Sequence, residues 1–195
     1  MDQPTDRRTQ IADAAIEVIA GDGIKALTHR RLDTVLDLPA GSTSYYFRTR
    51  GALLGAVAER IVDTSRTDFA ASGLTPEAGD LDTIGRAIAA ALDGTLERRQ
   101  SQLIARCVVA IELPTDSPLR VALATSLFSR SKAAELFRVL GADDPGTTAA
   151  DFVSLCEGLV FDRILGARSL DGLVAGSEAS RAQLARPLQM FLRGL

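Results

Sequence analysis

The chain has few of the residues from which metal and redox centres are built. Its 195 residues include two cysteines, one histidine and no tryptophan. Cys107 and Cys156 form no CxxC pair, so buried free thiols are favoured over a zinc cluster or a redox pair. His29 has no acid–base partner in the sequence, which favours a surface histidine over a catalytic one. We therefore expect no metal, no cofactor and no catalytic residue.

Long hydrophobic runs and a strong basic charge are also missing. No stretch approaches the roughly 18 uncharged apolar residues that a membrane-spanning helix needs. The charged N-terminus has no apolar segment behind it and does not resemble a signal peptide, so we expect a cytoplasmic protein with no membrane partner. The net charge is −3, so affinity for nucleic acid would have to come from charges placed on one face.

The residues that are present favour helices. The chain is 46% hydrophobic but only 5% aromatic, and it contains no alternating strand pattern longer than about four residues. Apolar spacing, capping residues and breakers predict an all-α protein of about nine helices. We expect them near residues 5–20, 28–36, 39–46, 50–71, 80–97, 101–113, 117–140, 148–168 and 177–195.

The most informative run is GSTSYYFRTR at residues 41–50, which contains both tyrosines of the chain. It follows the helical segment 28–36 after a short break. Two short helices joined by a tight turn, the second with small, hydroxyl, aromatic and arginine side chains, are typical of a helix-turn-helix DNA-binding motif. Small residues let a helix enter the major groove, hydroxyls reach phosphates and base edges, and arginines bind the duplex backbone. The alternative, core aromatics of a helical bundle, is favoured only for Phe47.

Residues 7–57 resemble the TetR family of transcriptional regulators. The resemblance rests on the Ala26-Leu27-Thr28 step, the arginine-rich second helix, the 41–47 run and the sequence RGALL at 50–54. It implies an N-terminal three-helix helix-turn-helix DNA-binding domain, residues 1–50, and a larger helical ligand-binding and dimerisation domain, residues 51–195. It also implies a homodimer that binds a palindromic double-stranded DNA operator.

The resemblance also implies roles for single residues. Thr28 would cap the second helix and touch phosphate, and Arg50 would meet phosphate. The expected DNA-binding residues are Thr28, Arg30, Pro39, Ala40, Gly41, Ser42, Ser44, Tyr45, Tyr46, Arg48 and Arg50. The sequence departs from the family at Asp37, where a turn glycine is common and Asp tolerates the left-handed conformation. It departs again at Ser44, where the family often has tyrosine.

Two further sites are expected in the remainder of the chain. An effector cavity between about residues 80 and 140 would be lined by Phe69, Leu103, Arg106, Cys107, Ile111, Phe128 and Phe137. Its low charge favours an apolar or weakly polar small molecule. Arg106, which lies in an apolar helix, needs a partner, and either an ion pair with Glu112 or a ligand would provide one. A dimer interface is expected on the apolar helix 148–168 and on the last helix, and the former would use Phe152, Val153, Cys156, Leu159, Val160 and Ile164.

The sequence therefore predicts a DNA-binding transcriptional regulator, and the family resemblance implies a repressor released from its operator by a small-molecule effector. One alternative is a helical ligand-binding or scaffolding protein without DNA-binding activity. A helical enzyme is a second alternative, and the absence of a nucleophile–base pair argues against it. The sequence does not identify the operator or the effector.

Overall fold

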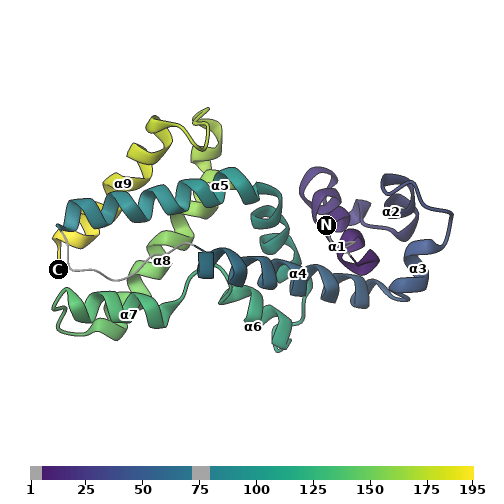
Figure 1. The fold of residues 1–195 in the computed structure, drawn as a ribbon, viewed down its shortest axis with the longest axis horizontal. Coiled ribbons are helices and arrows are strands. Elements are labelled where there is room, and N and C mark those ends of the chain that lie inside the picture. The colour runs from purple at the N-terminus through teal and green to yellow at the C-terminus, as the bar shows by residue number, and fades with distance from the viewer. Residues whose placement is uncertain (1–5, 72–79) are drawn as a thin grey trace. The chain divides into compact units, whose positions relative to one another are not determined.

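The computed structural model describes residues 6–71 and 80–195, including all of their side chains except those of residues 68–71. Within these ranges the chain forms nine α-helices, two 3₁₀ helices and no strand, which confirms the predicted all-α class (Figure 1). No helix in the described ranges is both long enough and apolar enough to cross a membrane. The helices are α1 (Arg7–Asp22), η1 (Ile24–Ala26), α2 (His29–Val35), α3 (Ser42–Tyr46), α4 (Arg50–Ala71), α5 (Leu81–Glu112), α6 (Pro118–Ala124), α7 (Arg130–Val139), α8 (Pro145–Ile164), η2 (Ala167–Leu170) and α9 (Glu178–Arg193).

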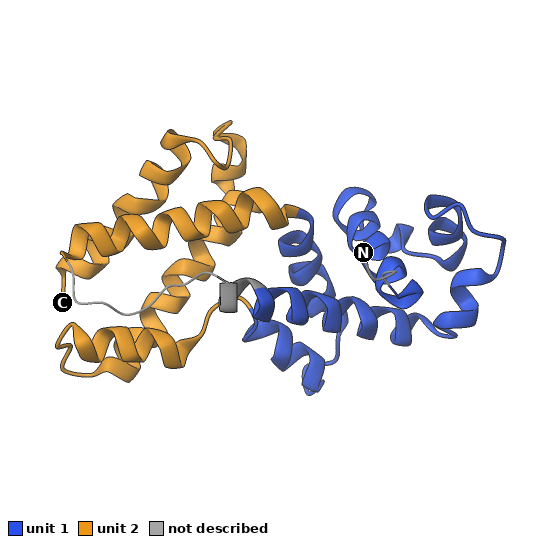
Figure 2. Ribbon diagram, in the orientation of Figure 1, with its two compact units in different colours: residues 1–69, 101–126 blue, residues 70–100, 127–195 orange. Residues whose placement is uncertain are grey.

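The helices group into two compact units (Figure 2). Unit 1 comprises residues 1–69 and 101–126, and unit 2 comprises residues 70–100 and 127–195. Helix α5 contributes to both units and has a non-helical residue, Arg99 (φ −130°, ψ 23°), beside the boundary. The compact units thus differ from the expected division at residue 50, because most of α4 packs with the helix-turn-helix. The functional division into DNA-binding and effector domains stays a prediction.

Unit 1 has an apolar core to which α1, α2, α4, α5 and α6 contribute buried side chains, and Tyr46 of α3 packs against it. Burial of each large side chain contributes about 1.5–3 kcal/mol. At the edge of this core, an ion pair joins α4 to α1. Arg60 on α4 donates to the carboxylate of Asp13 on α1 from Nε (2.6 Å) and from a terminal nitrogen (3.1 Å). The helix-turn-helix therefore packs against the same hydrophobic core as α1, α4, α5 and α6. Core residues include Ile11, Ile16, Leu32, Phe47, Val57, Ile61, Val109 and Leu123.

Several expected boundaries are confirmed around the helix-turn-helix. Helix α4 has the predicted bounds, and Asp37 takes the left-handed conformation with φ 50°. Helix α3 is shorter than expected and begins at Ser42 instead of Pro39. The three residues before it form a turn, in which Gly41 has φ 90° and the Ser42 N–H donates to the Pro39 carbonyl. A left-handed residue interrupts helical geometry, so the helix starts after Gly41.

The single helix expected over residues 117–140 is wrong, because residues 125–129 separate α6 from α7. Hydroxyl side chains explain the break. The Ser126 hydroxyl donates to the Leu123 carbonyl, and the Ser129 hydroxyl accepts from the Lys132 N–H to cap α7. Such local side-chain bonds satisfy backbone groups outside a helix and so compete with its continuation.

In unit 2, α5 and α9 are joined at two points along their lengths. Near the start of α5, Asp82 accepts hydrogen bonds from Arg193 at 2.9 and 2.7 Å. Eleven residues later along α5, Asp93 accepts one from Ser180 at the start of α9. The two helices therefore run antiparallel. Between these points a Cβ at Gly85 would lie 2.7 Å from Gln189 Cγ, so glycine permits the close approach.

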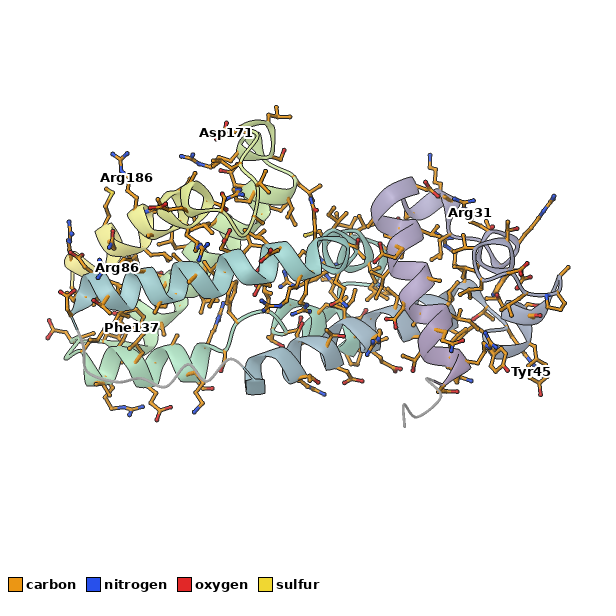
Figure 3. All side chains as sticks on the ribbon, turned by 45° about the horizontal axis from the view of Figure 1, so that its top comes forward. Arg31, Tyr45, Arg86, Phe137, Asp171 and Arg186 are labelled. Carbon is orange, nitrogen blue, oxygen red and sulfur yellow. The ribbon has the colours of Figure 1, made fainter. Side chains whose placement is uncertain are left out.

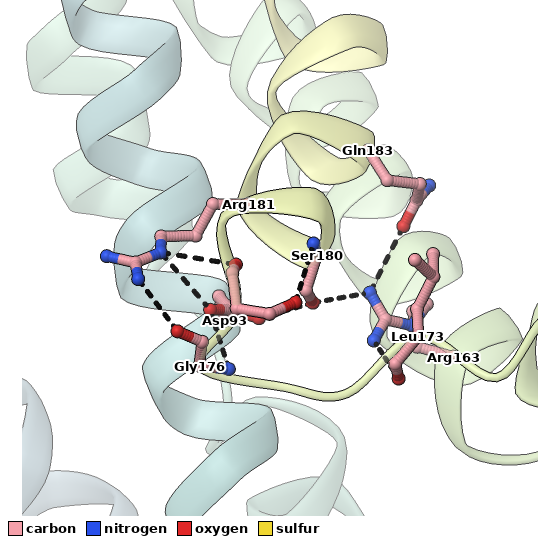
Figure 4. A network of polar contacts seen from close by, with 8 residues as sticks. Asp93, Arg163, Leu173, Gly176, Ser180, Arg181 and Gln183 are labelled. Carbon is pink, nitrogen blue, oxygen red and sulfur yellow. Dashed lines mark hydrogen bonds and ion pairs between the residues drawn. The ribbon is translucent and has the colours of Figure 1, made fainter.

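A buried polar network fixes the start of α9 (Figure 4). Asp93, 1% exposed, accepts from the Ser180 hydroxyl and from the Gly176 N–H at 2.9 Å. Arg163 on α8 is also buried and donates to the Ser180 hydroxyl at 2.8 Å and to the Leu173 carbonyl at 3.1 Å. The Ser180 hydroxyl thus links a buried carboxylate to a buried guanidinium.

We predict that Asp93→Ala lowers the free energy of unfolding by about 2 kcal/mol or more, because the Gly176 N–H and the Ser180 hydroxyl lose a buried acceptor. Thermal and urea unfolding, followed by circular dichroism, measure the change. The matched control is Asp171→Ala, since Asp171 is an exposed partner of Arg168 and its loss should cost no more than about 0.5 kcal/mol. Equal effects of the two variants would contradict the role assigned to Asp93.

Candidate nucleic-acid interface

Helices α2 and α3 pack against each other, and α2 also packs against α1. Helix α2 starts as predicted at Thr28, whose hydroxyl accepts from the Arg31 N–H at 3.1 Å. At the other end of the motif, His29 Nε2 lies 2.6 Å from the Phe47 carbonyl. The half-buried histidine thereby joins the first residue of α2 to the residue that ends α3.

The turn between α2 and α3 is held by Asp33, a residue that is only 5% exposed. One of its carboxylate oxygens accepts from the Gly41 N–H at 2.8 Å. The other accepts from the N–H and the hydroxyl of Thr43, at 2.8 and 2.6 Å. Asp33 on α2 therefore accepts from the backbone N–H groups at the start of α3, and so acts as a helix cap supplied by a neighbouring helix.

These bonds also set the charge state of Asp33. Burial alone would raise its pKa, but hydrogen bonds from the Thr43 hydroxyl, the Thr43 N–H and the Gly41 N–H favour the ionised form and lower the pKa below its ordinary value of 3.8. Asp33 is consequently a carboxylate at neutral pH, able to accept all three bonds.

The outer face of the motif carries most of the expected DNA-binding residues. Tyr45 is 78% exposed and projects from unit 1 (Figure 3). Its ring meets the half-buried Tyr46 ring edge-on, with centroids 5.4 Å apart. Pro39, Ala40 and Gly41 are exposed, and Ser42 and Ser44 are half-buried. The small residues leave the backbone of the turn open to solvent.

The arginines of this region differ in their surroundings. Arg30 and Arg48 are exposed, and no partner of their guanidinium groups is found among the described residues. Arg50 instead donates to the carbonyls of Leu27 and Ile24, at 2.9 and 3.0 Å. Removing Arg50 would leave these carbonyls without that donor, so Arg50 is a poor probe of phosphate contact. Arg48 is the better probe of phosphate contact, because its removal breaks no such bond within the described residues.

Sequence reasoning missed the residues that hold the motif together. Asp33 and Thr43 are separated by ten positions in different helices, and Asp33 looked like an ordinary helix charge. In the structure, Leu32 and Asp33 are the buried residues of α2, and nothing in the sequence indicated that an aspartate beside Leu32 would be one of them. Arg8 is another residue whose structural contact was missed. Its guanidinium lies over the Phe47 ring, 4.7 Å from the ring centre, in a cation–π contact.

The residues expected to line an effector cavity do not all fall in one unit. Leu103, Arg106, Cys107 and Ile111 belong to unit 1, whereas Phe128 and Phe137 belong to unit 2. The side chain of Phe69 lies outside the described residues. Leu103 is buried, Ile111 is 80% exposed, and Arg106 donates to the carbonyls of Leu123 and Ala124 at the end of α6. The cavity and its lining stay a prediction.

Phe137 is fully buried in unit 2, against residues from two other helices. Its ring centre lies 5.3 Å from that of Phe152 on α8 and 6.0 Å from that of Phe191 on α9. Phe152 was expected to face a second chain, but in this packing its side chain points into the core of its own chain. Cys156 and Val160 are also buried there, at 2% exposure each. These residues therefore contribute little surface for a partner.

The other expected interface residues, Val153, Leu159 and Ile164, are half-buried in the monomer.

The two cysteines lie in different units, and burial raises the pKa of the Cys156 thiol to about 12, so this thiol stays protonated at neutral pH. Among the described residues, no group of three or more histidine, cysteine, aspartate or glutamate side chains could hold a metal ion.

An all-α chain with an N-terminal helix-turn-helix belongs to the class of helical DNA-binding proteins by fold. Comparison with known families gives a narrower result. Residues 79–193 match the family described as tetracyclin repressor-like, C-terminal domain. Because this match covers more than half of the chain, the protein belongs to the TetR family of transcriptional regulators. A search of curated protein sequences found no match.

Solved structures agree with this assignment. The multidrug binding protein EbrR complexed with malachite green is 28% identical, with a TM-score of 0.61 over 93% of this chain and 97% of that one. A TetR-family member from Streptomyces coelicolor A3 is 25% identical, with a TM-score of 0.64 over 93% and 97%. A transcriptional regulator from Rhodococcus sp. Rha1 shares the fold, at 21% identity and a TM-score of 0.72 over 96% and 97%.

We predict that Asp33→Asn lowers the free energy of unfolding by about 1–3 kcal/mol, because an amide cannot accept three buried hydrogen bonds. The pKa of Asp33 is lowered in the folded chain, so its stabilisation is complete above pH 3.8 and is lost as the pH falls through the folded pKa. The difference between parent and variant should therefore shrink under acid conditions, as measured by urea unfolding at several pH values.

Asp37→Asn is the matched control, since Asp37 lies exposed in the same turn and asparagine also tolerates the left-handed conformation. It should change stability by no more than about 0.5 kcal/mol. A pH-independent difference between parent and Asp33→Asn would show that the ionised carboxylate is not the stabilising group.

Proposed function

We propose that this TetR-family protein is a sequence-specific DNA-binding repressor. It acts as a homodimer on a palindromic operator and is released when a small molecule binds. The observation that supports DNA binding most directly is the exposed Tyr45 and Arg48 at the end of α3, a helix held in place by the buried Asp33.

The charge distribution is consistent with this role. The net charge is −3, so the whole protein does not attract DNA. Two exposed guanidinium groups, those of Arg30 and Arg48, lie on the helix-turn-helix instead. Local cations of this kind bind phosphates and fix the register of a recognition helix without adding sequence information. Specificity then depends on the side chains of α3.

A second chain is proposed to pack on one stripe of α8. Ser154, Gly158 and Phe161 of α8 and Leu165, the residue that caps its C-terminal end, are all exposed and follow one another at intervals of four, three and four residues. Residues at this spacing share one helix face. Phe161 and Leu165 provide apolar surface, at 51% and 47% exposure, and Ser154 and Gly158 allow a partner helix to come close. A dimer gives two recognition helices, which a palindromic operator requires.

Regulation by a small molecule is proposed from the relatives. EbrR, which is similar in fold and up to 28% identical, is described in complexes with ethidium and with malachite green. For release, the effector must bind the DNA-incompetent arrangement better than the DNA-bound one, by about 1–3 kcal/mol in typical cases. An apolar or weakly polar effector is in keeping with the apolar residues expected to line the cavity.

In vitro selection with the full chain should recover a palindromic sequence, and fluorescence anisotropy then measures affinity. We predict that Tyr45→Ala lowers operator affinity about tenfold with little change in Tm, because the ring is exposed in the free protein. Arg48→Ala should weaken binding to all sequences and reduce the slope of log affinity against log salt by about one.

Arg66→Ala is the matched control for Arg48. Arg66 lies exposed on α4 beside Asp63 and should leave DNA affinity unchanged. If the parent protein selects no sequence and binds no DNA, the proposed function is wrong, and a ligand-binding or scaffolding role without DNA binding takes its place.

We predict that Phe161→Glu converts the dimer to a monomer, because a charge placed on the α8 stripe would be buried without a partner. Sedimentation equilibrium measures the mass. Leu170→Glu is the matched control, since Leu170 is 87% exposed on η2, off the stripe, and its variant should remain dimeric. A dimer that persists in Phe161→Glu would place the interface elsewhere.

A further inference from the structure

The two serines of α3 hold their hydroxyl hydrogens in a defined direction. Ser42 Oγ lies 2.6 Å from the Pro39 carbonyl oxygen, and Ser44 Oγ lies 2.7 Å from the Gly41 carbonyl oxygen. A carbonyl oxygen can only accept, so each serine is the donor. The hydrogens therefore point at the backbone, and the remaining lone pairs of both hydroxyl oxygens are left to accept from outside.

The threonines at the edges of the motif are arranged in the opposite way. Thr28 Oγ1 accepts from the Arg31 N–H, and Thr49 Oγ1 accepts from the Ala52 N–H, each at 3.1 Å. Both residues are exposed helix caps. Because an amide nitrogen is the donor in each bond, the threonine hydrogen is left to donate outward.

DNA offers different partners to these two kinds of hydroxyl. Phosphate oxygens only accept, and so do guanine N7 and O6 and thymine O4 in the major groove. The groups that donate there are the exocyclic amino groups, N6 of adenine and N4 of cytosine. An outward-donating hydroxyl thus suits a phosphate, whereas an outward-accepting hydroxyl suits an amino group on a base.

We propose that Ser42 and Ser44 read the operator as hydrogen-bond acceptors for the exocyclic amino groups of adenine or cytosine. Thr28 and Thr49 serve the phosphates. This assignment rests on the proposed DNA-binding function and specifies which chemical groups of the bases the recognition helix selects.

The surroundings of the turn keep the serines in this state. Asp33 holds the N–H groups of Gly41 and Thr43, which fixes the backbone that carries the accepting carbonyls. If a serine turned its hydrogen outward to donate to a base, it would lose a hydrogen bond of 2.6 or 2.7 Å inside the protein. Donation to guanine or thymine is therefore disfavoured relative to acceptance from adenine or cytosine.

The test uses the full chain and operator duplexes obtained by in vitro selection. Selection with the parent and with Ser42→Ala and Ser44→Ala identifies the base pairs at which preference is relaxed. At those pairs, one duplex set lacks the amino group, with purine in place of adenine or 2-pyrimidinone in place of cytosine. A second set keeps the amino group and lacks the purine N7 acceptor, through a 7-deazapurine. Anisotropy titrations give the affinities.

We expect removal of the amino group to lower the affinity of the parent about tenfold, and the 7-deazapurine to change it less than twofold. In the corresponding serine variant, removal of the amino group should have no further effect. Ser126→Ala is the matched control, since Ser126 Oγ also donates to a carbonyl three residues earlier, at 2.8 Å, in the same unit. It should respond to both duplex sets as the parent does.

Two results would overturn the proposal while leaving DNA binding intact. In the first, the 7-deazapurine weakens binding and loss of the amino group does not, which means that the serines donate. In the second, the serine variants keep the preference and the analogue response of the parent, which means that the serines do not read the bases. Failure of the parent to bind any duplex would instead refute the proposed function itself.

Discussion

The surface proposed to face DNA depends on one buried carboxylate. Helix α3 has five residues, and a helix of that length is not stable by itself in water. Asp33 stabilises its first turn by accepting from Gly41 and Thr43, and the buried Phe47 anchors its end in the core. Because the carboxylate uses these donors inside the protein, the Gly41 and Thr43 amides are not left for phosphate. The contacts proposed for this turn therefore use its side chains.

The same arrangement occurs again in unit 2. Asp93, like Asp33, projects from one helix and accepts from a left-handed glycine that precedes another helix, Gly176 in one case and Gly41 in the other. Each aspartate also accepts from a hydroxyl in the following helix, that of Ser180 or Thr43. A charged acceptor can satisfy an amide and a hydroxyl together, so one buried residue fixes both the turn and the helix after it. The chain thus uses buried aspartates to position the short α3 and the start of α9.

Hydroxyl groups on the surface of unit 1 differ in a way that burial alone does not reveal. Ser42 and Ser44 are helix residues whose hydrogens are bound to backbone carbonyls, while Thr28 and Thr49 are caps that accept from amides. The position of a hydroxyl relative to a helix start therefore decides whether it donates or accepts toward solvent. The net charge of −3 does not attract DNA, so the proposed recognition relies on such directed polar groups.

The sequence by itself determined the helical class, the bounds of α4, the Thr28 cap and the left-handed Asp37, because these follow from apolar spacing and from the conformational preferences of single residues. It also located the motif that carries Tyr45. Tertiary structure decided the inward direction of Phe152 and the role of Asp33. An apolar residue on a helix looks the same whether it faces its own core or a second chain. A polar residue becomes a structural anchor only when folding brings a distant donor to it and removes water.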